Sequence, residues 1–80
     1  MVFINIPYVP ENKRISKDLI QKELQILDIS EEQKADAYDA IYNLAPRGVS
    51  FGDNLQGAVA LENALIKLNV PCRQSEESEY

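Results

Sequence analysis

The sequence predicts an α+β fold in which two or three strands pack against three helices, in the order β-α-α-(β)-α-β. Three observations support this prediction. The first residues are rich in β-branched and aromatic side chains. Three later segments repeat apolar residues at helical spacing, and two of them begin with a capping-box pattern. A short alternating segment between glycines separates the second helix from the third.

Residues 2–9 (VFINIPYV) predict the first strand, because β-branched and aromatic side chains suit a pleated, half-buried surface. Pro7 has no backbone N–H to donate, so this is either an edge strand or a strand that ends near Ile6. The polar residues 10–14 then predict a turn.

Two helices follow, each with a serine at its start. Ser16 can cap a first helix that reaches about Leu27. The segment Ser30-Glu31-Glu32-Gln33 is a capping box, in which the serine and glutamine side chains each bond to the backbone N–H of the other. It begins a second helix that continues to about Leu44 and stops before Pro46.

The last third of the chain predicts a strand, a helix and a strand. In residues 47–52, apolar and polar side chains alternate and are bracketed by Gly48 and Gly52. This pattern indicates a short strand or an extended loop. Asp53-Asn54-Leu55-Gln56 repeats the capping-box pattern and begins a third helix that reaches about Asn69. Residues 70–74 form a short final strand.

The third helix has a wide apolar stripe and a thin polar face, so more than one of its sides must be covered. The cover is either the rest of the monomer or a second copy of the chain. For the case of a homodimer, the candidate self-association residues are Leu61, Leu65 and Leu68.

A chain of 80 residues has room for one domain, which we expect to span residues 1–74. Residues 75–80 form an acidic segment that we expect to be disordered. No apolar run approaches the length of a membrane span, and the first residues lack the basic start of a signal peptide. Together with a single cysteine, these features predict a cytoplasmic protein without membrane contact.

Composition excludes several chemistries. Without histidine and with one cysteine, the chain cannot form histidine-based triads or cysteine–histidine metal sites, so we expect no catalytic, cofactor or metal site. Cys72 has no histidine to act as its base, which favours a buried small side chain over a nucleophile. A net charge of −5 argues against direct nucleic-acid binding, which usually needs a basic patch.

The second helix carries the candidate partner-binding surface. Tyr38 and Tyr42 lie one helical turn apart, and tyrosine is favoured at interface hot spots. The alternative is that both rings cover the edge of the core with their hydroxyls in water. Four carboxylates on the same helix complete the candidate surface: Glu31, Glu32, Asp36 and Asp39. Their alternative role is the solvated face of an amphipathic helix.

A resemblance covers most of the chain. The residues that carry it are Ile29–Ala35 (ISEEQKA), Leu44–Ser50 (LAPRGVS), Ala60-Leu61-Glu62 and Leu65–Pro71 (LIKLNVP). With the β-α-α-β-α-β order, these residues resemble the C-terminal domain of the bacterial ribosomal stalk protein, whose fold is shared by the Clp protease adaptor. The resemblance implies a small, non-catalytic domain that docks onto a larger machine. The acidic segment Asp28–Asp39 and the lack of histidine depart from the factor-binding helix and the substrate pocket of those families.

The sequence therefore predicts an acidic, cytoplasmic, non-enzymatic interaction or adaptor module that binds a protein partner. The alternative function is that of an acidic nucleic-acid mimic, which inhibits a basic protein that processes nucleic acid. That mimic would bind its target in a salt-sensitive manner through Asp36, Asp39, Glu31 and Glu32, whereas an adaptor would depend more on the tyrosines.

Overall fold

The computed structural model describes the backbone of all 80 residues and every side chain except those of Asn12 and Lys13. It confirms the predicted α+β fold. The elements follow the order β1 (Val2–Ile6), the 3₁₀ helix η1 (Pro10–Arg14), α1 (Lys17–Gln25), α2 (Glu31–Tyr42), β2 (Arg47–Gly52), α3 (Leu55–Lys67) and β3 (Arg73–Ser75).

The three strands form an antiparallel sheet in the order β2-β1-β3, so β1 is the central strand. The strand ends at Ile6, which is one of the two alternatives that Pro7 predicted. Pro7 has no backbone N–H to donate to a neighbouring strand, so it could not continue a central strand. The last strand begins at Arg73, later than expected, and Val70 lies in the core as part of the preceding loop.

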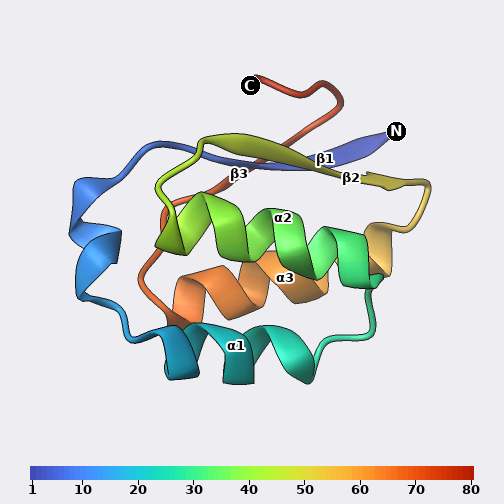
Figure 1. The fold of residues 1–80 in the computed structure, drawn as a ribbon. Coiled ribbons are helices and arrows are strands. Elements are labelled where there is room, and N and C mark those ends of the chain that lie inside the picture. Colours follow the sequence, from blue (N-terminus) through green and yellow to red (C-terminus); the bar gives the residue numbers. More distant parts are fainter.

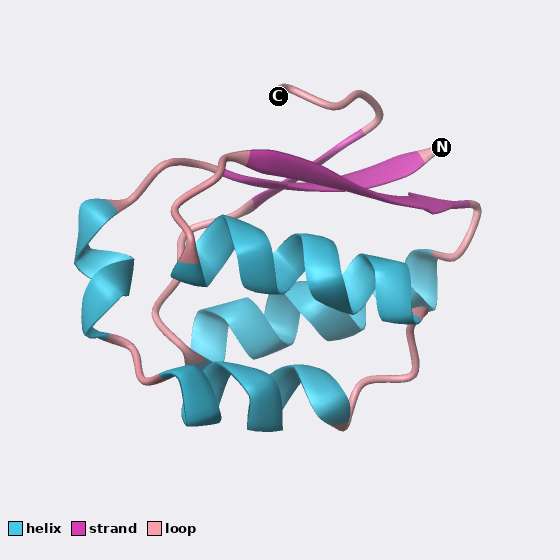
Figure 2. Ribbon diagram, in the orientation of Figure 1, coloured by secondary structure: helices cyan, strands magenta, loops and turns pink.

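The molecule has three layers (Figures 1 and 2). The sheet is the first layer, α2 and α3 each contact it from the same side, and α1 contacts both of these helices on the side away from the sheet. All three α-helices therefore lie on one side of the sheet, and its other face is left to the C-terminal end of the chain.

The hydrophobic core lies between the sheet and the helices. Alternation along the strands points Ile4 and Ile6 of β1, with Val49 and Phe51 of β2, toward the helices, and all four are buried. Most of the other core side chains come from the helices: Ile20, Leu24, Ala37, Ala40, Ile41, Ala58, Leu61 and Leu65. Leu68 and Val70, which follow α3, complete the core.

Each helix begins at a capping side chain. The Ser16 hydroxyl accepts from the backbone N–H of Leu19, and Ser30 forms the predicted capping box with Gln33. The cap of α3 differs from the expected box that starts at Asp53. Asn54 is the N-cap, because its side-chain oxygen accepts from the N–H of Gly57 at 3.0 Å.

The end of α2 also differs slightly from the expected end at Leu44. The helix ends at Tyr42, and the backbone N–H of Asn43 donates to the Asp39 carbonyl as the C-cap. Leu44 adopts a positive φ of 55°, a left-handed conformation that cannot continue the helix and that turns the chain toward β2.

The outer face of the sheet is crossed by the C-terminal tail (residues 76–80), as Figure 1 shows. The tail follows β3 and is held by the side chain of Asn5 in β1. The domain boundary predicted after Gln74 stays a prediction. Ser75 belongs to β3, and the segment expected to be disordered makes hydrogen bonds with the central strand.

Candidate functional site

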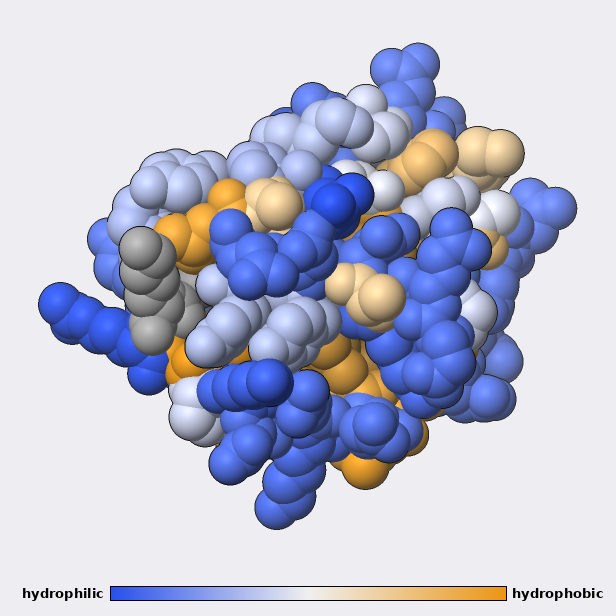
Figure 3. Space-filling view, in the orientation of Figure 1, coloured by the Kyte–Doolittle hydropathy of each residue, from blue (hydrophilic) through white to orange (hydrophobic). Residues whose placement is uncertain are grey.

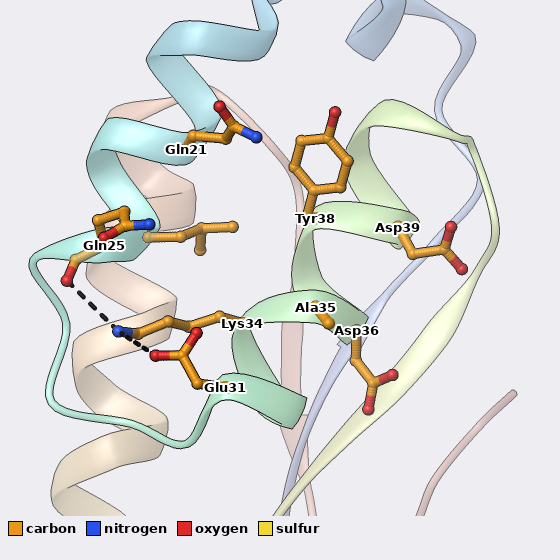
Figure 4. A pocket seen from close by; sticks show the side chains of 9 residues that line it. Gln21, Gln25, Glu31, Lys34, Ala35, Asp36, Tyr38 and Asp39 are labelled. Carbon is orange, nitrogen blue, oxygen red and sulfur yellow. Dashed lines mark hydrogen bonds and ion pairs between the residues drawn. The ribbon is translucent and has the colours of Figure 1, made fainter.

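A shallow cavity of about 440 Å³ lies between α1 and α2, and we call it the α1–α2 groove (Figure 4). Helical spacing builds its two walls, because residues three and four apart share one face of a helix. The groove is lined by Gln21, Leu24 and Gln25 from α1 and by Glu31, Lys34, Ala35, Asp36, Tyr38 and Asp39 from α2.

Tyr38 is the largest side chain in the groove. Its ring stands between the two helices, opposite Gln21, in Figure 4, and it is half-buried against the hydrophobic core. The ring stacks on Tyr42, one turn further along α2, with the ring centres 5.4 Å apart and the planes inclined by 20°. Tyr42 is 42% exposed, so the stack leads from the core to the surface.

Lys34 lies at the end of the groove near the α1–α2 loop. Its ammonium group donates to the backbone carbonyl of Gln25 at 3.4 Å and lies 3.5 Å from the Glu31 carboxylate. The lysine side chain is only 16% exposed, whereas that of Glu31 is 89% exposed. This end of the groove therefore presents a solvated carboxylate above a lysine that is held in place.

Asp39 is engaged on the other side of α2. Figure 4 shows the carboxylates of Asp36 and Asp39 directed away from α1. The Asp39 carboxylate accepts from the side-chain amide of Asn43 at 2.6 Å and from the Nε of Arg47 at 2.9 Å. These bonds hold the pKa of Asp39 below its usual value, and Asp39, followed by the charge of Asp36, raises the pKa of Arg47.

The structure brings five of the six candidate partner-binding residues to this part of α2. Four of them line the groove: Glu31, Asp36, Tyr38 and Asp39. Tyr42 adjoins it through the ring stack, while Glu32 is exposed and does not line it. Sequence reasoning missed the α1 wall, although the spacing of Gln21 and Gln25 beside the buried Leu24 was a usable signal.

The candidate self-association residues do not lie on the surface. Leu61 and Leu65 have no exposed area, and Leu68 is 6% exposed, so all three belong to the core of the single chain. Within the single chain, α3 contacts the sheet and α1, so the structure favours cover by the rest of the monomer. Contact of these residues with a second copy stays a prediction. The exposed apolar side chains of α3 are Leu55, Val59 and Ile66.

The remaining chemistry-bearing group is Cys72, which is half-buried in the loop before β3. Burial, and then the nearby charge of Glu62, raise the pKa of its thiol above the usual value. Over the part of the chain with described side chains, no three His, Cys, Asp or Glu residues lie close enough together to hold a metal ion.

No protein-family model, curated protein or solved structure matches the chain. The resemblance to the stalk-protein domain and the Clp adaptor therefore stays a prediction. Within the described residues, none of the helices has both the length and the apolar character needed to cross a membrane. Figure 3 shows that polar side chains dominate the viewed face, with small apolar areas between them.

Proposed function

We propose that this protein is a non-enzymatic, cytoplasmic interaction module whose α1–α2 groove binds a protein partner. The observation that carries the proposal is the position of Tyr38, whose half-buried ring stands in a groove beside acidic side chains. A partner segment that suits this groove has an apolar side chain to pack on the ring and a neighbouring lysine or arginine to face the exposed Glu31 carboxylate.

The chemistry of the groove supports this partner class. Leu24, Ala35 and the ring of Tyr38 offer apolar contact area. The Tyr38–Tyr42 stack is a rigid aromatic surface, and a cation above such a ring is attracted to its face. The exposed carboxylate of Glu31 adds attraction for a basic side chain at one end of the groove.

The same geometry favours an adaptor over an acidic nucleic-acid mimic. A mimic needs a surface with one sign of charge, but two α2 carboxylates already face cations of this chain. Asp39 pairs with Arg47, and Glu31 lies beside Lys34. The groove therefore combines aromatic area with a modest negative charge, which supports recognition through the tyrosines.

The shifted pKa values also support a non-catalytic role. The pKa of the Asp39 carboxyl is lowered, while the pKa values of Arg47 and the Cys72 thiol are raised. Each shift moves the pKa of the group further from neutral pH, whereas a general acid or base works best with a pKa near neutral. These residues are better suited to holding elements together than to moving protons.

A charge placed in the groove tests the proposal. Ala35 is exposed and lines the groove, so Ala35→Arg puts a long, positively charged side chain there without entering the core. The matched control is Gln56→Arg, at an exposed position of α3. Tagged wild-type protein and both variants are incubated with a lysate of the source cell, and the captured proteins are quantified by mass spectrometry.

We expect one stoichiometric partner with the wild type and the control, and at least about tenfold less of it with Ala35→Arg, as expected for loss of a hot spot. Binding of the purified partner is then measured in low and high salt. A partner retained by Ala35→Arg would contradict the proposal. Loss of binding at high salt with no effect of Tyr38→Ala would favour the acidic mimic instead.

A further inference from the structure

The outer face of the sheet contains a polar side chain that a central strand would not be expected to bury. Asn5 is 1% exposed, although it points away from the core that Ile4 and Ile6 form. Its amide nitrogen donates to the Ser75 hydroxyl at 2.7 Å and to the Glu77 carbonyl at 3.2 Å. Its amide oxygen accepts from the backbone N–H of Glu79 at 3.0 Å. The tail therefore both buries and satisfies this amide.

Asn5 binds the tail as a neighbouring strand would. It bonds to the carbonyl before Ser78 and to the N–H after Ser78, which is the pattern that one residue makes with a parallel strand. These two contacts involve only the main chain of the tail, so they place no demand on the side chains of Glu77 and Glu79.

The side chain of Ser78 is selected by a different feature. Gly48 of β2 lies opposite Asn5 in the sheet register. A Cβ atom at Gly48 would clash with the Ser78 hydroxyl and would lie 2.7 Å from the Asn5 amide oxygen. The missing side chain of Gly48 thus makes room for the tail, and this room suits a small residue at position 78.

The third side of the site is basic. Arg73 of β3 lies opposite Asn5 on the other side of β1, and its Nε is 3.4 Å from the Glu79 carboxylate. An acidic residue directly after the small residue is therefore matched by a cation. We call the site formed by Asn5, Gly48 and Arg73 the outer-face notch.

We propose that the outer-face notch is a peptide-binding site of this protein, and that the C-terminal tail occupies it in place of a partner. The partner chemistry that fits is an extended segment in which a small residue is followed by an acidic one. The bound tail residues, Glu77 and Glu79, lie 72 and 74 positions from Asn5 in the sequence, so these bonds join distant parts of the chain. A separate peptide can make the same contacts.

The tail then competes with every such partner. A tethered segment has an effective concentration on the order of millimolar, so a free peptide is outcompeted until the tail is released. The apparent affinity of a free peptide is its affinity for the open notch multiplied by the fraction of molecules whose notch is open. The notch lies on the face opposite the helices, so this proposal is independent of partner binding in the α1–α2 groove.

The test uses the full chain with its tail disabled. Glu79→Pro removes the N–H that donates to Asn5, and Ser78→Tyr puts a large side chain against Gly48. Two-dimensional NMR spectra first establish that each variant is folded. An acetylated pentapeptide with the sequence of residues 76–80 is then titrated into the wild type and both variants, while the side-chain amide of Asn5 and the N–H of Gly48 are followed.

We expect the peptide to shift both signals in the two variants, with an apparent Kd at least about tenfold lower than in the wild type. Adding Gly48→Ala to Glu79→Pro should weaken this binding, because the new methyl group occupies the space of the serine. If neither signal moves in either folded variant at about 10 mM peptide, ten times the effective concentration of the tail, the proposal is overturned. Equal binding with and without Gly48→Ala would overturn it too, because the peptide would then bind elsewhere.

Discussion

At the scale of single residues, polar side chains connect parts of the molecule that are distant in sequence. Gln33 accepts from the Ser30 N–H at 2.9 Å and donates to the Ser50 carbonyl at 2.8 Å, so one amide caps α2 and ties it to β2. Asp39 makes a second tie between these elements through Arg47. The two contacts are 6 residues apart in α2, and together they orient the helix that carries the groove.

The thiol of Cys72 allows a prediction about pH. Burial and the charge of Glu62 raise its pKa, so the folded protein has less thiolate at a given alkaline pH than the unfolded chain has. A pH series of labelling rates with a thiol reagent should give a higher midpoint for the folded protein than for the urea-unfolded protein. Glu62→Gln should lower the folded midpoint part of the way. Identical midpoints in the two states would contradict the prediction.

At the scale of elements, the start of α2 offers a test of the double role of Gln33. Ser30→Ala removes the hydroxyl that accepts from the Gln33 N–H, and it should lower the free energy of unfolding by about 1 kcal/mol. Gln33→Glu keeps an acceptor for the Ser30 N–H but cannot donate to Ser50, so it should cost about 0.5–1.5 kcal/mol.

Urea unfolding followed by circular dichroism measures both losses. Glu32→Gln is the control, because Glu32 lies in the same turn and takes part in neither bond, and it should cost less than about 0.5 kcal/mol. A Gln33→Glu variant as stable as the wild type would show that the bond to Ser50 contributes nothing measurable.

A pair of neighbouring residues in α3 separates core from surface. Leu65 has no exposed area, so Leu65→Glu loses its packing and buries a carboxylate, at a cost of several kcal/mol in a domain of marginal stability. We expect that variant to be unfolded by circular dichroism. Ile66 is 62% exposed, so Ile66→Glu should remain folded. A folded, monomeric Leu65→Glu variant of an otherwise dimeric protein would instead support self-association through this side of α3.

At the scale of the whole molecule, the C-terminal tail makes the last contacts with the outer face of the sheet. Deleting residues 76–80 leaves Asn5 without its bonds to Glu77 and Glu79, at a cost of about 1–2 kcal/mol. For a domain of this size, that loss corresponds to a fall in Tm of roughly 5–10 °C.

Differential scanning calorimetry measures this fall, and deletion of Tyr80 alone is the control. The control keeps both bonds to Asn5, so we expect its Tm to stay close to that of the full chain. A fall of less than about 2 °C on full deletion would show that the tail contributes little, as expected for a disordered end.

Much of the architecture could be predicted from local patterns. The capping box at Ser30 and the cap at Ser16 depend on side chains within three residues, so they were readable without a structure. The α2 half of the groove followed from helical spacing in the same way. The spacing of Gln21 and Gln25 indicated a polar face of α1, but the pairing of Gln21 with Tyr38 could not be predicted, because it requires the packing of two helices.

The sequence by itself determined the order of the elements, the starts of α1 and α2, and the tyrosine pair of α2, because each depends on residues within about one helical turn. Only the tertiary structure decided that Leu61 and Leu65 are core and that β1 is central. It also decided that the acidic end of the chain lies on Asn5. These features join residues up to 74 positions apart, and they follow from which surfaces the whole chain can cover at once.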